Sequence, residues 1–379
     1  MRFAIVSETY PPEINGVALT VASLEQGLRD LGHAVELARP RRSDDPAQDP
    51  DTVLVRSAPV PRYPGLRFGL PCTAALRARW ARERPDAIYI ATEGPLGWSA
   101  LRAARRLAIP AATGFHTRFD DYAARYGMGF LTPAVFSWLR RFHNQGAATL
   151  VPTDQLAGFL ASRGFLNVVK LSRAVDTTLF HPSRRDLGLR KEWGLAEDDL
   201  AVVHVGRIAP EKNLSLAVST FRALQAQRPD ARYIWVGDGP SRGALQRENP
   251  DFIFAGLRRG DDLARHFASA DLFPFPSTSE TFGNVTLEAM ASGVATVAYD
   301  YGAAREHIRD RINGRAIEVD AAAAFTRATV ALASDDATRA QLARVGRHSV
   351  EGLCPASVSR QFEDILAGLA RTDRRENAA

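Results

Sequence analysis

The stretch LAVVHVGRIAPEKNLSLAVSTFRALQAQRPDARYIWVGDG, residues 200–239, decides the fold class. It begins with an apolar, β-rich run (200–207) and continues with a helical pattern of leucines and alanines (213–230). A second apolar run (231–239) follows and ends in glycines. Strands that alternate with helices in this way predict a parallel sheet that is covered on both faces.

The same alternation runs through most of the chain. The other apolar runs that we interpret as strands are 2–8, 33–40, 86–92, 110–116, 148–153, 251–256, 271–277 and 294–300. The pattern restarts after about residue 170, so we predict an α/β protein of two Rossmann-like, doubly wound domains, 1–170 and 171–355, facing across a cleft. A terminal helix (357–375) has an apolar face that needs a partner surface, and we expect the tail after Arg371 to be flexible.

Length and composition restrict the classes of protein that this chain can represent. The 379 residues exceed one ordinary core, and 45% apolar and 24% charged residues are typical of a soluble globular protein. No apolar run reaches the roughly 18 residues that a membrane-spanning helix needs, and we see no signal-peptide layout. With only Cys72 and Cys354, we expect no disulfide framework, no zinc site and a cytoplasmic location.

The formal net charge of +5 is unevenly distributed. Residues 1–170 contain 21 lysines and arginines against 15 aspartates and glutamates, whereas the remainder is close to neutral. Arginines alternate with apolar residues across positions 62–84; those near the end of this segment are Arg77, Arg79, Arg82 and Arg84. A basic face could bind an anionic membrane, nucleic acid or an acidic substrate, and a merely solvated face is the alternative.

Two cations follow the first strand of the opening stretch. That strand ends at Gly206, and Arg207 and Lys212 lie in the loop before the next helix. A planar guanidinium and a compact ammonium at the carboxyl end of a strand suit the oxygens of a diphosphate. The glycine spacing and the Lys-Ser/Thr pair of a Walker loop are missing. Two solvated loop cations are the alternative interpretation.

A second group of residues lies in PSTSETFGNVTLEAMASG, residues 276–293. Gly283 and Asn284 mark a turn before a helix, where backbone N–H groups can point at phosphate. Glu280 precedes the turn and Glu288 falls about one helical turn after it. A carboxylate only accepts hydrogen bonds, and a vicinal diol is a paired donor. We therefore expect the glutamates to bind sugar hydroxyls on either side of a diphosphate, unless they are solvated surface charges.

Two loops in the first half carry weaker signals. Asn15-Gly16 marks a turn directly before a helix, where a glycine can admit a phosphate, although an ordinary strand-to-helix loop has the same pattern. His116 follows an apolar strand and should lie at the cleft edge, but a lone histidine is more often structural or solvated. Arg118, Asp120 and Asp121 follow it without a fixed catalytic spacing.

Together these motifs resemble the retaining glycosyltransferases of family 4, in order and over nearly the whole chain. The resemblance rests on NGVALTVASLEQGLRDLGH (15–33), GRIAPEKN (206–213), VGDGP (236–240) and the two-glutamate stretch followed by AMASG (289–293). AVDTTLFHP (174–182) resembles the inter-domain segment of that family, although Arg173-Ala174 stands where the family usually has Asn-Gly. The implied fold is the GT-B architecture, in which 1–170 would be the acceptor-side domain and 171–355 the nucleotide-sugar-binding domain, with the last segment (356–379) crossing back to the first domain.

The resemblance also implies roles for single residues. Arg207 and Lys212 would neutralise the donor diphosphate. Glu288 would bind the ribose of the nucleotide, and Glu280 would hold hydroxyls of the transferred sugar. Gly16 would let its loop close on the donor, and His116 would contact the sugar near the reacting carbon. The backbone that would line sugar and phosphate belongs to Phe282, Gly283, Asn284 and Val285.

The expected function is therefore retaining transfer of a hexose from a nucleotide diphosphate sugar to a lipid or glycan acceptor. Within the family, the chain looks most like bacterial α-mannosyltransferases and glycolipid synthases, which favours GDP-mannose ahead of UDP-glucose or a UDP-uronate. We expect no cofactor and no metal, because the cationic clamp would stabilise the leaving diphosphate and no Asp-x-Asp motif follows a strand.

Three other classes of function compete with this interpretation. A nicotinamide dehydrogenase is disfavoured because no strand is followed by G-x-G-x-x-G. A non-catalytic nucleotide-sugar-binding protein would bind the donor without turnover, and a sugar-nucleotide epimerase would interconvert donors without an acceptor. The expected partners are the donor, the acceptor and an anionic membrane surface contacted by the first domain, with peripheral attachment at the inner face of the cell membrane left open. We expect no nucleic-acid partner.

Overall fold

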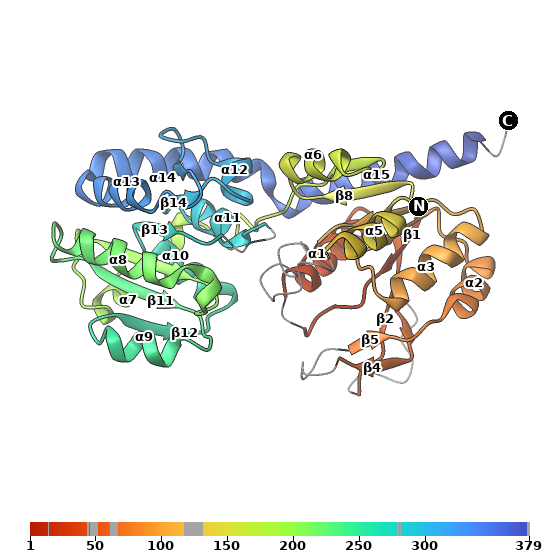
Figure 1. The fold of residues 1–379 in the computed structure, drawn as a ribbon, viewed down its shortest axis with the longest axis horizontal. Helices are drawn as coiled ribbons and strands as arrows, with labels where there is room; N and C mark the ends of the chain where they lie inside the picture. Colours follow the sequence, from red (N-terminus) through yellow and green to blue (C-terminus); the bar gives the residue numbers. More distant parts are fainter. Residues whose placement is uncertain are drawn as a thin grey trace. The chain divides into compact units, whose positions relative to one another are not determined.

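The computed structural model describes residues 1–376, except for Ile14, Asp44, 46–51, 61–66, 117–131, Ser279 and Thr281. The chain forms two compact units (Figure 1). The first unit comprises Met1–Ala174 together with Pro355–Ala379, and the second comprises Val175–Cys354. Each unit contains a parallel sheet with helices on both faces, so the predicted class of two doubly wound α/β domains is confirmed.

The sheet of the first unit has seven strands in the order β3-β2-β1-β6-β7-β8-β9, and neighbouring strands are parallel. Their bounds are β1 (Arg2–Val6), β2 (Ala34–Pro40), β3 (Thr52–Val55), β6 (Ala87–Ile90), β7 (Ala111–Gly114), β8 (Ala148–Val151) and β9 (Val168–Lys170). A separate antiparallel pair consists of β4 (Ser57–Pro59) and β5 (Arg67–Gly69). The short strands β3, β4, β5 and β9 add to those that the sequence predicted.

Helices cover both faces of this sheet. Alternating strand residues such as Phe3 and Ile5 pack against α1 (Gly16–Asp30) and α15 (Pro355–Glu376), whereas Ala4 and Val6 pack against α2 (Thr73–Arg82) and α3 (Pro95–Arg106). The described part of this unit also contains α5 (Thr132–His143) and α6 (Asp154–Ser162). The terminal helix α15 therefore belongs to the core of the first unit.

The apolar face of α15 contains two fully buried side chains, Phe362 and Leu366. Phe362 meets Tyr89 of β6 edge to face, with ring centroids 4.9 Å apart. α15 continues as far as Glu376, past Arg371, where the sequence predicts that the tail begins, and these residues are mostly good helix formers. Residues 377–379 lie outside the described part of the chain.

The sheet of the second unit has the order β12-β11-β10-β13-β14-β15 and is parallel. Its strands are β10 (Ala201–Val205), β11 (Arg232–Val236), β12 (Ile253–Gly256), β13 (Leu272–Phe275), β14 (Ala295–Tyr299) and β15 (Arg315–Ile317). Its helices are η2 (Pro182–Arg184), α7 (Leu187–Glu192), η3 (Pro210–Lys212), α8 (Leu214–Gln225), α9 (Arg242–Glu248), α10 (Gly260–Ala268), α11 (Asn284–Ala291), α12 (Ala303–His307), α13 (Ala322–Ser334), α14 (Asp336–Val350) and η4 (Glu351–Leu353).

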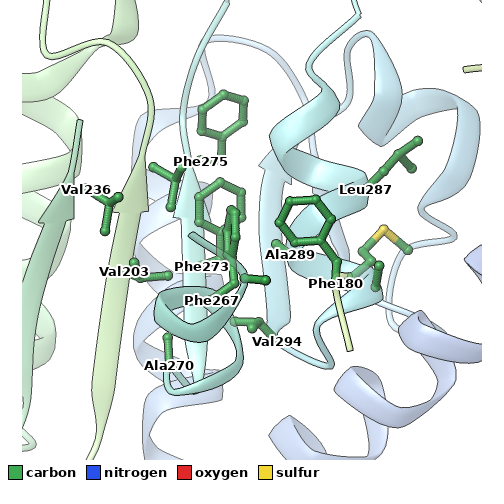
Figure 2. Close-up of a cluster of buried hydrophobic side chains, with 14 of the residues drawn as sticks. Phe180, Val203, Val236, Phe267, Ala270, Phe273, Phe275, Leu287, Ala289 and Val294 are labelled. Carbon is green, nitrogen blue, oxygen red and sulfur yellow. The ribbon is translucent and has the colours of Figure 1, made fainter. Parts of the chain in front are cut away.

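Alternation along β10 divides the core of this unit into two layers. Val202 packs toward α8 and α13, whereas Val203 and Val205 pack toward α10 and α11. Figure 2 shows the second layer, in which Val203 and Phe273 of neighbouring strands lie with Phe267 of α10. Full burial of each such side chain contributes roughly 1.5–3 kcal/mol. This core fixes the strands whose carboxyl ends carry the predicted motifs.

Strand order also indicates where a ligand should bind in the second unit. β10 and β13 are neighbours, and the chain proceeds outward from them in opposite directions through β11 and β14. Ligands of open α/β sheets bind outside the carboxyl ends of the strands at such a switch point. The two loops that leave β10 and β13 here contain Lys212 and Glu280.

Candidate active site

The loops after β10 and β11 are held against each other by backbone contacts. Gly206 N–H donates to Val236 O, and Ile208 N–H donates to Asp238 O at 2.9 Å. Gly237 has φ = +141°, and a Cβ there would lie 1.9 Å from the carbonyl oxygen of Gly206. Only glycine permits this approach. The loops that contain the GRIAPEKN and VGDGP motifs therefore pack closely against each other at the carboxyl edge of the sheet.

Lys212 lies at the end of η3, directly before α8. Asn213 follows it in the left-handed conformation (φ = +55°), which turns the chain into the helix. The Lys212 ammonium forms an ion pair with Glu280 Oε1. Ser277 Oγ donates to the same oxygen at 2.8 Å. The structure thus joins two motifs that lie 68 residues apart in sequence.

Arg207 is placed differently from Lys212. Its side chain is 64% exposed, and its Nη1 lies 3.4 Å from Glu211 Oε1. This contact joins two flexible, solvated side chains and contributes little to stability. Arg207 can therefore move to meet an anion, whereas Lys212 is held by Glu280.

Glu288 lies in the second turn of α11. It is half-buried, and burial raises the pKa of its carboxyl to about 7. No residue in the described part of the chain donates a hydrogen bond to this carboxylate. A carboxylate that is partly desolvated and has no donor is well suited to accept two hydroxyls of a diol.

The turn between the two glutamates is also strained and closely packed. Gly283 has φ = +92° and forms the N-terminal boundary of α11, and as a glycine it supplies no side-chain cap. Gly302 (φ = +55°) approaches Phe282 so closely that a Cβ there would lie 2.4 Å from the Phe282 carbonyl oxygen, and Ala303 N–H donates to that oxygen. The first N–H groups of the helix, at Asn284 and Val285, precede the first intrahelical hydrogen bonds. Such groups favour an anion.

In the first unit, Gly16 begins α1 and is exposed. Asn15 caps the helix by accepting from Ala18 N–H at 2.8 Å, and its Nδ2 donates to Thr9 Oγ1 at 2.7 Å. A Cβ at Gly16 would meet nothing within 4 Å. Local packing therefore does not require glycine at this position.

His116 lies just after β7, and both of its ring nitrogens have partners. Arg173 Nη2 donates to Nδ1 at 2.7 Å, and Tyr89 Oη lies 2.7 Å from Nε2. Because arginine is only a donor, Nδ1 must be the unprotonated nitrogen and Nε2 carries the proton. Burial and the Arg173 charge lower the pKa of His116 well below its ordinary value, so the ring is neutral.

Sequence reasoning missed Arg173 and Tyr89 as neighbours of His116. Arg173 was noticed only as a departure from the family pattern, and Tyr89 was assigned to an apolar strand. That departure was the available signal, because a charged residue replaces a small polar one next to a predicted site. The neighbouring Arg118, Asp120 and Asp121 lie outside the described residues.

Comparisons with known proteins show the family that this chain resembles. Residues 14–179 match the family described as Glycosyltransferase Family 4, and residues 199–335 match Glycosyl transferases group 1. A GDP-mannose-dependent alpha-mannosyltransferase of Mycolicibacterium smegmatis is 36% identical over 84% of this chain and 85% of its own length. An alpha-monoglucosyldiacylglycerol synthase of Acholeplasma laidlawii is 26% identical over 79% of this chain and 81% of its own length.

Solved structures show the same fold. The sucrose-phosphate synthase of Thermosynechococcus elongatus superimposes with a TM-score of 0.76 at 18% identity, over 98% of this chain and 99% of that protein. At this level of identity the likeness concerns the fold alone. It agrees with the two parallel-sheet units described above and with the predicted GT-B architecture.

Proposed function

The chain belongs to glycosyltransferase family 4, and we propose that it is a retaining enzyme that transfers mannose from GDP-mannose to a lipid or glycan acceptor. The observation that carries the proposal is the meeting of Lys212 with Glu280 at the switch point of the second sheet, beside the helix that contains Glu288. The M. smegmatis relative supports GDP-mannose as the donor. UDP-glucose and a UDP-uronate remain the alternatives.

Each residue of this group has a chemical task in the proposal. Lys212 and Arg207 neutralise the charge that develops on the diphosphate as it leaves, which is worth most in the transition state. Glu288 accepts hydrogen bonds from the ribose diol. Glu280 uses Oε1 for Lys212 and Ser277, which leaves Oε2 to accept a hydroxyl of the sugar. We propose that these groups act without a metal ion.

A membrane-borne acceptor is supported by the charge of the first unit. The helices α3 and α5 contain five exposed arginines and no acidic residue; these are Arg102, Arg105, Arg106, Arg140 and Arg141. Trp138 on α5 is 44% exposed and lies 6.0 Å from the ring of Trp98 on α3. Arginine attracts anionic headgroups, and tryptophan favours the interfacial layer. We name this set of residues the α3–α5 face.

The segment 62–84 is less suitable for docking than its sequence indicated. Arg79 Nε donates to the buried Glu36 at 2.8 Å, and Arg84 donates to the carbonyl oxygens of Leu107 and Ala108. Arg77 and Arg82 are exposed, and residues 61–66 lie outside the described residues. Among the described residues, no helix is long and apolar enough to span a membrane. We therefore propose peripheral contact through the α3–α5 face.

A transfer assay tests the proposed function. Purified protein is incubated with GDP-mannose and a membrane lipid extract, and NMR of the product determines the anomeric configuration. We expect an α-mannoside, which retains the configuration of the donor. A β-mannoside would contradict the retaining mechanism, donor interconversion without acceptor would indicate an epimerase, and tight donor binding without turnover would indicate a binding protein.

A further inference from the structure

Arg173 is one of two buried arginines in the described part of the chain, and its environment is unusual. It is 9% exposed, against 1% for the other, Arg190. Burying a charged group costs several kcal/mol unless an opposite charge or hydrogen bonds compensate it. The two arginines should therefore both be compensated, and only one of them is.

Arg190 shows how this chain normally buries a guanidinium. Its Nη1 lies 3.0 Å from a carboxylate oxygen of Asp271 and donates to Ser269 O at 2.8 Å. Its Nη2 donates to three further carbonyl oxygens, those of Ala196, Glu197 and Asp199. One carboxylate and four carbonyl oxygens thus accept from the two terminal nitrogens of Arg190, whereas its Nε has no partner among the described residues.

Arg173 has none of these acceptors. Its one recorded hydrogen bond goes to Nδ1 of His116, which is a neutral ring, and no carboxylate in the described residues pairs with it. A guanidinium has five N–H donors, so most of them have no described acceptor. Burial lowers the pKa of Arg173, and only the Tyr89 phenol counters this effect. The cation is therefore largely buried, and no carboxylate among the described residues compensates its charge.

The surroundings of Arg173 hold it firmly in place. His116 is fixed from its other side by Tyr89, which is itself fully buried and packs on Phe362 of α15. The Arg173–His116–Tyr89 chain is thus anchored in the core of the first unit, at the carboxyl edge of its sheet. An oxyanion bound to Arg173 would meet preorganised donors in a low-dielectric environment, where such hydrogen bonds are strong.

We propose that Arg173, braced by His116, is a binding subsite for an anionic group, carboxylate or phosphate, on the acceptor substrate. Assignment to the acceptor rests on the proposed function, because there the donor diphosphate is already served by Arg207 and Lys212 in the second unit. Arg173 lies in the first unit, which the family resemblance makes the acceptor side. The acceptor is then an acidic sugar or a phospholipid rather than a neutral glycan.

NMR of the full-length protein with isotope-labelled histidine tests this inference. The His116 signals are assigned with a His116→Gln variant, and inorganic phosphate or acetate is then titrated at constant ionic strength. We expect saturable shifts of the His116 signals in the wild type. The Arg173→Gln variant, which keeps donors but loses the charge, should bind the anion at least about tenfold more weakly. The Arg173→Lys variant keeps the positive charge and should bind the anion with intermediate affinity. It shows that the weaker binding of Arg173→Gln comes from the lost charge and not from a folding defect.

The two probes distinguish the two sources of the anion. Preference for phosphate indicates a lipid phosphate, and preference for acetate indicates a sugar carboxylate. The exposed Arg247→Gln serves as the matched control and should leave the titration unchanged. Absence of a saturable shift, or equal shifts in the wild type and Arg173→Gln, would overturn the subsite.

Donor binding separates this inference from the proposed function. GDP-mannose should bind the wild type and Arg173→Gln with equal affinity. If Arg173→Gln weakens GDP-mannose as much as it weakens phosphate, the anion is the donor diphosphate and the assignment to the acceptor is wrong. If GDP-mannose fails to bind the wild type while phosphate still shifts the His116 signals, the proposed donor is wrong and the anion-binding subsite is supported.

Discussion

The carboxyl edges of the two sheets carry uncompensated groups of opposite charge. In the second unit the cation Lys212 is paired with Glu280, and the carboxylate Glu288 has no donor among the residues that the structure describes. In the first unit the cation Arg173 donates to the neutral ring of His116, and no carboxylate among the described residues pairs with it. One edge is thus prepared for hydroxyl donors and the other for an anion. The difference teaches that the two units offer opposite kinds of group to a ligand, a hydrogen-bond acceptor in the second unit and a cationic donor in the first.

The largest effect that follows concerns the cations of the second unit. We expect Lys212→Ala and Arg207→Ala each to reduce kcat about a hundredfold or more, because both stabilise the departing diphosphate. Steady-state kinetics with GDP-mannose measures this effect. Lys191→Ala, at an exposed position of the same unit, is the matched control and should behave as the wild type. Unchanged turnover in both active-site variants would place the phosphate clamp elsewhere.

A smaller effect concerns Glu288, whose carboxylate has no hydrogen-bond donor among the described residues. Glu288→Gln should weaken GDP-mannose binding about tenfold, because an amide nitrogen replaces one acceptor for the ribose diol. The wild-type affinity should also fall as pH drops through about 7, where the Glu288 carboxyl becomes protonated. Calorimetric titration between pH 6 and 8.5 measures both. A wild-type affinity that is as insensitive to pH as that of the variant would refute this role.

The ionised Glu288 carboxylate should also reduce the free energy of unfolding. Burial raises the pKa of Glu288 from 4.5 to about 7, so the folded protein binds the extra proton between these values and loses stability as pH rises through them. Glu288→Gln removes this penalty. We expect the variant to match the wild type below pH 4.5 and to be more stable by about 1–2 kcal/mol at pH 8, after allowance for partial exposure. Denaturant unfolding at both pH values tests this, and a destabilised variant at pH 8 would contradict it.

The smallest effect concerns the α3–α5 face of the first unit. Replacing Arg102 and Arg141 with serine should weaken binding to anionic vesicles several-fold, at roughly 1 kcal/mol per well-placed arginine, and raised salt should do the same. Vesicle sedimentation measures the partition. Donor affinity should be unchanged, and Arg247→Ser on the second unit is the control. Equal binding to neutral and anionic vesicles would indicate that this face does not dock electrostatically.

Sequence reasoning worked best where structure follows local periodicity. The apolar runs 200–207 and 231–239 became β10 and β11 to within a few residues, because buried parallel strands are continuous hydrophobic runs. The motif cations and the Glu280–Glu288 stretch can be recognised as candidate site residues for the same reason, since each lies directly after such a strand. Short elements such as β3 and β4 were missed, because three or four residues carry too little pattern.

Contacts between distant segments could not be predicted in the same way. Arg173 reaches His116 across 57 residues, and Tyr89 reaches it across 27. The alternation of strand residues placed Tyr89 in the core but gave no indication that its hydroxyl meets a histidine at the sheet edge. The hydrogen bond from Arg79 to Glu36 could not be predicted from the sequence for the same reason. These partners are fixed by strand order and helix packing, which single motifs do not encode.

Donor binding tests the central claim most directly. Calorimetry or thermal shift with GDP-mannose, UDP-glucose and free GDP, each with and without EDTA, compares the wild type with Lys212→Ala. The account predicts that GDP-mannose binds the wild type most tightly, that EDTA changes nothing, and that Lys212→Ala loses most of the affinity for both guanosine ligands. Failure of every nucleotide sugar to bind, or binding that needs a divalent metal and ignores Lys212, would contradict it.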